Sequence, residues 1–227
     1  MPVDHRPLHV LYEDNHLLAM VKPAMLPTMG VTKGQPSLLA LARDYVQRKY
    51  DKPGRVYLGV VSRLDAPVSG VVLLARTSKA AARLCAQFRC QAVRKVYWAA
   101  VAHRVRPATG RLIHFIGRDE QHRRMQIASA RATGALEARL SYRTLQDVVN
   151  GTLLEVVPET GRKHQIRLQL ASFGHPILGD RKYGSRQPFP LGIALHCREL
   201  VFQHPVRQHS VTLTAPLSRA WRSLGCR

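Results

Sequence analysis

The chain has 227 residues, 45% of them hydrophobic, which is enough for one sizeable domain with its own core and argues against a disordered chain. It carries 35 Lys and Arg residues against 14 Asp and Glu, a formal net charge of +21, so nucleic acid is the first partner to expect. A membrane surface is disfavoured because the sequence has neither a basic amphipathic helix nor a lipidation motif. A basic surface with no partner is the alternative.

The N-terminal half alternates between short strands and helices. Residues 9–12 and 16–21 predict two strands around a turn. Residues 70–75 form an apolar run typical of a buried strand, and residues 96–101 predict another. Helical spacing follows Pro36-Ser37 and recurs from Ser78, where the predicted apolar face comprises Ala81, Leu84, Cys85 and Phe88.

The C-terminal half is richer in strands. Residues 103–134 predict strands joined by exposed basic loops, and residues 136–145 and 152–157 predict a hairpin around Asn150-Gly151. A helix is predicted over 163–173, ending at Gly174. Residues 201–202 and 211–213 predict the last strands. The pattern indicates an α+β domain with a central, largely antiparallel (mixed) sheet and flanking helices and loops.

The cysteines and the chain start carry little signal for a special site. Cys85, Cys90, Cys197 and Cys226 make no C-x-x-C pair and have no His at zinc-finger spacing, so we expect reduced thiols, with Cys85 in the core, and no metal. No secretory signal and no apolar run long enough to span a bilayer is present, so we expect a cytoplasmic protein without membrane contact.

Two segments hold residues suited to chemistry. In residues 61–70, Arg63 and Asp65 flank a leucine in a loop before a strand, and in an extended segment they point the same way. A surface ion pair is the alternative. In residues 159–167, basic side chains crowd a helix start, where exposed amides and the helix dipole attract anions. A plain basic helix face explains that segment equally well.

These segments resemble motifs of the RluA-type pseudouridine synthases. Arg63-Leu64-Asp65 with Ser69-Gly70 resembles the catalytic motif of that family. Further resemblance, in the same order along the chain, is found at Leu11-Tyr12-Glu13-Asp14, Lys22-Pro23, Lys95-Val96-Tyr97, Thr160-Gly161-Arg162, residues 164–167 and 174–180, His204-Pro205 and Ala215-Pro216. The resemblance covers about residues 9–217 and predicts a single catalytic domain over residues 1–227, without the N-terminal RNA-binding module that some members carry.

The resemblance implies isomerisation of uridine to pseudouridine in RNA. Asp65 would be the catalytic aspartate, acting either as a nucleophile at C1′ or as a base at C2′. Tyr97 would lie on the uracil and help remove the C5 proton, and Arg162 would pair with the aspartate. Arg63 would fill the space that the flipped base leaves.

The resemblance also implies a partner and excludes cofactors. The substrate would be a structured rRNA or tRNA bound by a monomer, with no metal and no redox cofactor. Besides Arg63, the predicted RNA-binding residues are Lys163, His164, Gln165 and Arg167, with His164 ordering the helix start or contacting RNA.

Several positions depart from the family pattern. The family has His where this chain has Ser62, a basic residue at Ala66, Thr at Val68 and at Lys163, and Gly at Met25. Asp65, Tyr97 and Arg162 are in place, so the departures concern the substrate more than the chemistry. The alternatives are an inactive RNA-binding or assembly protein of the same fold and a glycosidase that releases free uracil.

Overall fold

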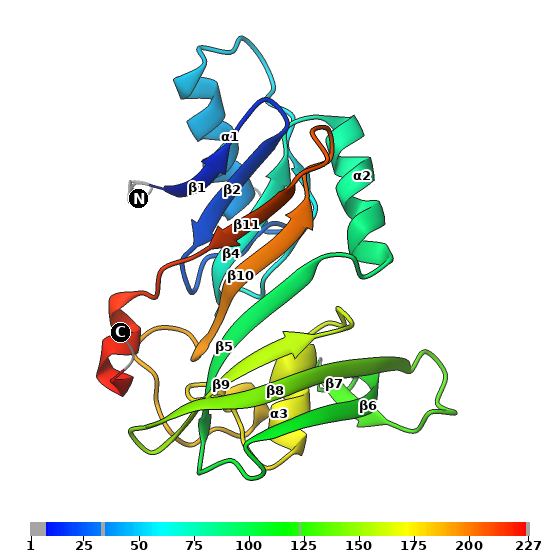
Figure 1. Cartoon of the computed structure of the whole chain (residues 1–227), viewed down its shortest axis with the longest axis vertical. Coiled ribbons are helices and arrows are strands. Elements are labelled where there is room, and N and C mark those ends of the chain that lie inside the picture. The colour runs from blue at the N-terminus through cyan, green and yellow to red at the C-terminus, as the bar shows by residue number, and fades with distance from the viewer. Residues whose placement is uncertain (1–7, 33–34, 123, 226–227) are drawn as a thin grey trace. The chain divides into compact units, whose positions relative to one another are not determined.

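A computed structural model of the protein describes residues 8–32, 35–122 and 124–225. The expectations about the chain start and Cys226 lie outside these residues, as does Arg123 within the basic segment predicted over residues 103–134. The chain divides into two compact units: unit 1 is Met1–Val93 with Cys197–Pro216, and unit 2 is Arg94–His196 with Leu217–Arg227. Figure 1 labels the helices and strands of both and colours them by residue number. That the two units form one catalytic domain stays a prediction.

Unit 1 is built on a sheet with β4 (Ser69–Ala75) at its centre, where all seven residues are buried. Antiparallel neighbours are β2 (Leu17–Lys22) and the short β3 (Gly59–Val60), and β2 also pairs with β1 (His9–Glu13). Strand β3 lies on the edge of β4 away from β2, because Leu74 and Ala75 pair with both strands. On that edge β4 also pairs with β10 (Leu195–Gln203), which pairs with β11 (Ser210–Thr214). Continuous apolar strands such as β2 and β4 are therefore explained by burial on both faces.

Gly70 permits the close approach of β10 to the start of β4. Its φ is +123°, and a Cβ there would collide with the backbone carbonyl of Cys197. A side chain would be strained in this conformation and would push the strands apart. The C-terminal end of the loop that carries Asp65 is therefore held where β4 packs closely against β10.

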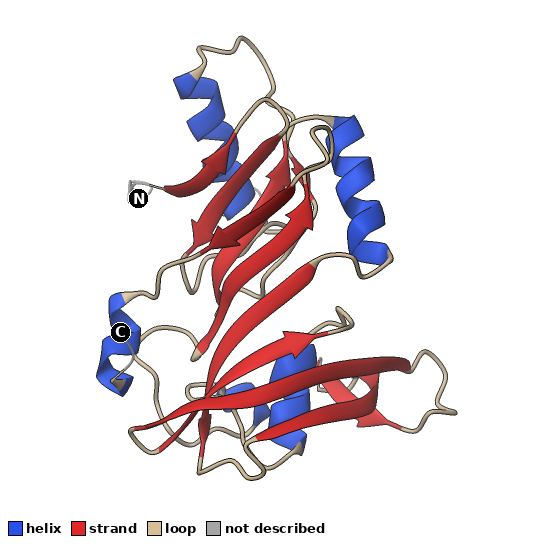
Figure 2. Ribbon diagram, in the orientation of Figure 1, coloured by secondary structure: helices blue, strands red, loops and turns tan. Residues whose placement is uncertain are grey.

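Two capped helices belong to unit 1 (Figure 2). Helix α1 (Leu38–Lys49) begins after Ser37, and α2 (Ser78–Arg89) begins after Thr77; each cap hydroxyl accepts a hydrogen bond from the third amide beyond it. In α2 the structure buries Ala80 and Leu84, whereas Cys85 is exposed. The prediction of Cys85 as a core residue is wrong because α2 turns a different face of the helix toward β4.

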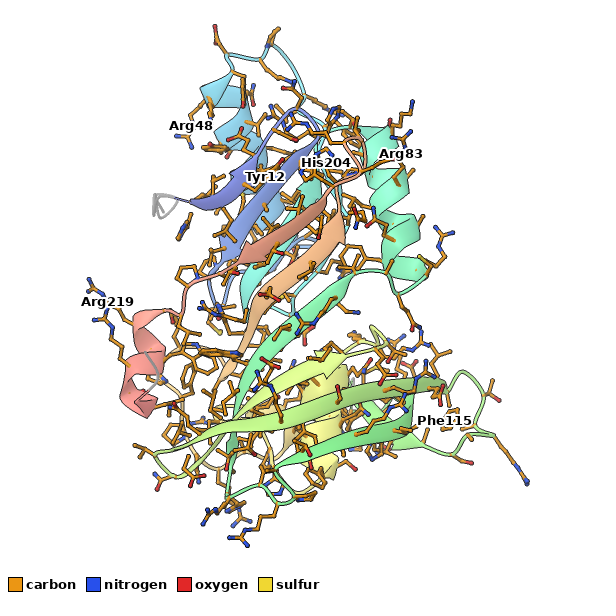
Figure 3. All side chains as sticks on the ribbon, viewed as in Figure 1. Tyr12, Arg48, Arg83, Phe115, His204 and Arg219 are labelled. Carbon is orange, nitrogen blue, oxygen red and sulfur yellow. The ribbon has the colours of Figure 1, made fainter. Side chains whose placement is uncertain are left out.

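A buried histidine joins two motifs of unit 1 that lie far apart in the sequence. His204 Nε2 donates to Asp14 Oδ2 over 2.9 Å, while its Nδ1 accepts from the backbone amides of Val206 and Arg207. Tyr12, labelled with His204 in Figure 3, donates its hydroxyl to the same carboxylate. These bonds connect the β1–β2 turn with the β10–β11 turn.

Unit 2 is an antiparallel sheet in the order β5-β9-β8-β6-β7. The strands are β5 (Arg94–Ala102), β6 (Thr109–Asp119), β7 (Arg124–Ala128), β8 (Leu136–Val148) and β9 (Gly151–Pro158). The predicted β8–β9 hairpin is confirmed, with Asn150 at φ +61° in its turn.

Helix α3 (Gln165–Ser172) packs on this sheet. Leu168 contacts Ile116 and Ala138 in a buried cluster, and Gln169 Nε2 donates to two strand carbonyls. The helix starts two residues later than predicted and is followed by Gly174 at φ +87°. Short 3-10 helices lie at Arg181–Tyr183 and Arg219–Leu224. None of the helices described is long and apolar enough to cross a membrane.

Candidate functional site

The loop between β3 and β4 in unit 1 alternates in the burial of its side chains. Leu64 is buried, at 8% exposure, whereas Arg63 is exposed and Asp65 is half-buried. This is the alternation expected of an extended segment. The carbonyl of Asp65 accepts from the amide of Val68, so a turn follows the aspartate directly.

Ser62 fastens the start of this loop. Its Oγ accepts a hydrogen bond of 2.8 Å from the amide of Leu73 in β4. The Ser62 hydroxyl therefore holds the loop against the central strand of unit 1.

Thr28 fastens the middle of the loop. Its buried hydroxyl donates to the Leu64 carbonyl over 2.9 Å and accepts from the Leu64 amide over 3.1 Å. One side chain thus satisfies both backbone groups of the residue that precedes Asp65.

Lys22 fastens the far side of the aspartate. The residue ends β2 opposite Gly70, and its side chain is fully buried. Nζ donates to the carbonyls of Pro23, Leu26 and Ala66 over 2.9, 2.7 and 3.1 Å, so all three ammonium hydrogens have acceptors. Burial lowers the pKa of Lys22 to about 7, and the carboxylate of Asp65 opposes that shift.

Tyr97 lies in unit 2, on β5. It is half-buried and stands opposite Val156 of β9 in the antiparallel register. The backbone of Tyr97 is therefore fixed by the pairing of β5 with β9.

Arg162 lies in the turn before α3. Its Nε donates to the Glu137 carbonyl over 2.9 Å, and its amide donates to the side chain of Gln165. Gln165 is buried and also bonds Thr160 Oγ1 and the Arg139 carbonyl. The glutamine therefore shapes the turn that presents Arg162.

His164 and Lys163 precede α3 and differ in exposure. His164 has the left-handed φ of +55°, and its Nδ1 lies 2.8 Å from the Tyr183 hydroxyl. This contact agrees with a role in ordering the helix start. Lys163 is exposed.

Arg167 is a buried member of a structural ion pair. Its Nε and one terminal nitrogen lie 2.7 and 2.9 Å from the two carboxylate oxygens of Asp180, and both side chains are at most 6% exposed. The guanidinium also lies over the Tyr183 ring, 5.1 Å from its centroid. Arg167 and Gln165 thus have partners inside unit 2, and their contact with RNA stays a prediction.

Sequence reasoning did not identify Lys22 or Thr28 as site residues. Lys22-Pro23 follows a predicted strand and indicates only where that strand ends. A single threonine after a proline does not indicate a functional site. Only the three-dimensional proximity of residues 22–28 to the loop at residues 62–66 shows their contribution. Within the described ranges, no group of three or more His, Cys, Asp or Glu side chains could hold a metal ion.

Comparisons with known proteins place the chain in a family. Residues 16–172 match the family model described as RNA pseudouridylate synthase. The chain is 34% identical over 228 residues to ribosomal large subunit pseudouridine synthase D of Xylella fastidiosa, covering 93% of this chain and 66% of that protein. It is 32% identical over 217 residues to the dual-specificity RNA pseudouridine synthase RluA of Pasteurella multocida, covering 92% and 93%.

A solved structure supports the same assignment. Human RNA pseudouridylate synthase domain containing 4 superposes with a TM-score of 0.78 and 26% identity, over 96% of this chain and 93% of that one. The α+β fold expected from the sequence is thereby confirmed. By its family model, its relatives and its fold, the chain belongs to the RNA pseudouridylate synthases, which are isomerases acting on RNA.

Proposed function

We propose that this enzyme converts a specific uridine of a structured rRNA or tRNA to pseudouridine, with Asp65 as the catalytic aspartate. The observation that carries the proposal is the fastened loop: residues 62, 64 and 66 are bonded to the body of unit 1, and Arg63 and Asp65 stand between them. A catalytic carboxylate needs such a rigid mounting to meet its target atom.

The reaction breaks the bond from C1′ to N1, turns the uracil and joins C1′ to C5. In one route the Asp65 carboxylate attacks C1′ and is later displaced by C5; in the other it takes the C2′ proton and returns it. Either route ends with loss of the C5 proton and gain of a proton at N1, so the product is an isomer. Both need an ionised carboxylate.

Tyr97 and Arg162 complete the proposed machinery. We assign Tyr97 to the uracil, where a ring on a rigid strand can stack and help remove the C5 proton. Arg162 is assigned to the aspartate as its cationic partner. Support for these two roles is the match to the family motifs and the fixed backbone on which each residue stands.

RNA binding is proposed to depend on base flipping and on positive charge. Arg63 is exposed beside Asp65, and its planar guanidinium can stack in the space that the flipped uridine leaves. Lys163 and His164 are proposed to contact RNA near the start of α3. The net charge of +21 would supply further contacts with phosphate.

The substrate class is proposed from the relatives. One of them is named as a ribosomal large subunit synthase, which favours rRNA over tRNA. Action on cellular RNA also fits the proposed cytoplasmic location, and a monomer is part of this proposal.

A tritium-release assay tests the proposal. RNA labelled with 5-tritiated uridine would be isolated from cells lacking the gene and incubated with the enzyme. Wild-type enzyme should release tritium from C5 without releasing free uracil, and Asp65→Asn should not. Mapping of pseudouridines with and without the gene should show one or a few sites lost. No tritium release and no site lost would instead favour an RNA-binding protein without catalysis.

A further inference from the structure

The loop at residues 62–66 depends on side chains from outside it for its shape. Apart from the turn after Asp65, this segment has no regular secondary structure. Its anchors are Ser62 bonding Leu73 of β4, Thr28 bonding Leu64, and Lys22 bonding Ala66. The backbone carbonyls of Leu64 and Ala66, the residues on either side of Asp65, are therefore held by side chains of residues 22–28.

Thr28 makes two hydrogen bonds to the backbone of Leu64, whereas Lys22 makes one to the backbone of Ala66. A hydroxyl has one hydrogen to donate and lone pairs to accept with, and Thr28 uses both on one residue, as a neighbouring strand would. Thr28 is 3% exposed and Leu64 is 8% exposed, so water has little access to replace these bonds. The hydroxyl fixes the plane of the peptide group that joins Leu64 to Asp65.

We propose that Thr28 is a positioning residue for the reaction, acting by fixing the Leu64 backbone so that the Asp65 carboxylate meets the ribose. This inference rests on the proposed role of Asp65. Without the hydroxyl, the Leu64 amide and carbonyl lose their partners and the loop must move to find others. A shift of about 1 Å at a reacting group lowers a rate by about a hundredfold.

The chain contains a matched control for this proposal. Thr152 in β9 is fully buried, donates its hydroxyl to the His103 carbonyl and accepts from the Val105 amide, each over 3.1 Å. It thus has the same residue type, similar burial and the same pair of backbone bonds as Thr28. It serves a different loop, 103–105 in unit 2, which carries none of the proposed catalytic residues.

The experiment compares Thr28→Val, Thr152→Val and Thr28→Ser. Valine keeps the size of threonine and removes the hydroxyl, whereas serine keeps the hydroxyl. Single-turnover tritium release from the RNA of gene-deleted cells, labelled with 5-tritiated uridine, would be measured over a range of enzyme concentrations. That series separates the rate at saturation from the enzyme concentration at half saturation. Unfolding temperatures would be recorded for each variant, and rates measured well below them.

Thr28→Val should lower the saturating rate about tenfold to a hundredfold and leave the half-saturating concentration within about twofold of wild type. Thr152→Val should lose comparable stability at an unchanged rate, and Thr28→Ser should keep most of the rate. If Thr28→Val does not fold, Thr28→Cys replaces it, with an intermediate loss because a thiol bonds weakly.

Equal rates for Thr28→Val and Thr152→Val, with Asp65→Asn inactive, would overturn the positioning role alone. Activity retained in Asp65→Asn would instead remove the proposed function on which the inference rests.

Discussion

The Nζ atom of Lys22 lies 3.1 Å from the carbonyl oxygen of Ala66, the residue that follows the proposed catalytic aspartate. The ammonium group is fully buried and has two further carbonyl acceptors, from Pro23 and Leu26. The Lys22 ammonium group therefore bonds both the segment that follows β2 and the loop that carries Asp65. This cation links the stability of unit 1 to the geometry of its loop.

The burial of Lys22 predicts a pH-dependent stability. Its pKa is about 7 in the folded protein and 10.5 in the unfolded chain, so between these values the unfolded state holds more protons. The free energy of unfolding should therefore rise from pH 7 to pH 9 by about 2 kcal/mol relative to Lys22→Met. Urea unfolding of both proteins at several pH values measures this difference.

Relative to Lys22→Met, the free energy of unfolding should fall as the pH falls from 10.5 toward 7, and the difference should level off at lower pH, where Lys22 is protonated in both states. Asp65→Asn should lower the pKa of Lys22 further, because the carboxylate raises it. Parallel curves for wild type and Lys22→Met would contradict a depressed pKa.

Replacement of Met25 by glycine is expected to stabilise the protein. It has the left-handed φ of +67° and is 59% exposed, so its side chain is strained and covers little of the core. Met25→Gly should raise the free energy of unfolding by about 0.5–1 kcal/mol, the relief of strain exceeding the added freedom of the unfolded chain. Met29, also exposed but without a positive φ, is the control. Met29→Gly should be neutral or destabilising, and the same gain at both positions would argue against strain at Met25.

The buried pair of Arg167 and Asp180 predicts a large structural effect. Asp180→Asn leaves a buried guanidinium without its carboxylate and should lower the free energy of unfolding by about 3 kcal/mol. The double variant Arg167→Met with Asp180→Leu should recover most of that loss, because it removes both charges. Chemical denaturation measures both proteins, and no recovery would mean that the pair contributes more than the burial of charge explains.

Replacement of Lys163, in contrast to Asp180, is expected to change RNA binding and not stability. Because it is exposed before α3, Lys163→Met should leave the free energy of unfolding within about 0.5 kcal/mol of wild type. If it contacts phosphate, the slope of log affinity for RNA against log salt should decrease in magnitude by about one. Filter binding at several salt concentrations tests this, and an unchanged slope would exclude a phosphate contact.

The elements of the fold were largely predictable because their signals are local. Ser37 before an apolar helix and Asn150-Gly151 between two strands determine a cap and a turn within a few residues. The exposed face of α2 was not predictable, because packing against β4 decides which apolar residues are covered. Cys85 is exposed for that reason.

The candidate site was predictable only in part. The motif order pointed to Asp65, Tyr97 and Arg162, whose roles stay predictions. The supporting residues gave no signal: Lys22 and Thr28 reach the Asp65 loop across 44 and 36 residues of sequence, and only folding brings them there. Likewise, the basic character of residues 162–167 did not reveal that Arg167 turns inward to Asp180.

The most direct test of the account is tritium release from 5-tritiated uridine RNA by wild-type enzyme and by Asp65→Asn at matched concentration. The substitution removes the negative charge and keeps the side-chain size. The account predicts release by wild type and at least a thousandfold slower release by the folded variant, roughly the loss expected when a catalytic nucleophile or base is removed. Release at a comparable rate by Asp65→Asn would contradict the assignment of Asp65 as the catalytic residue.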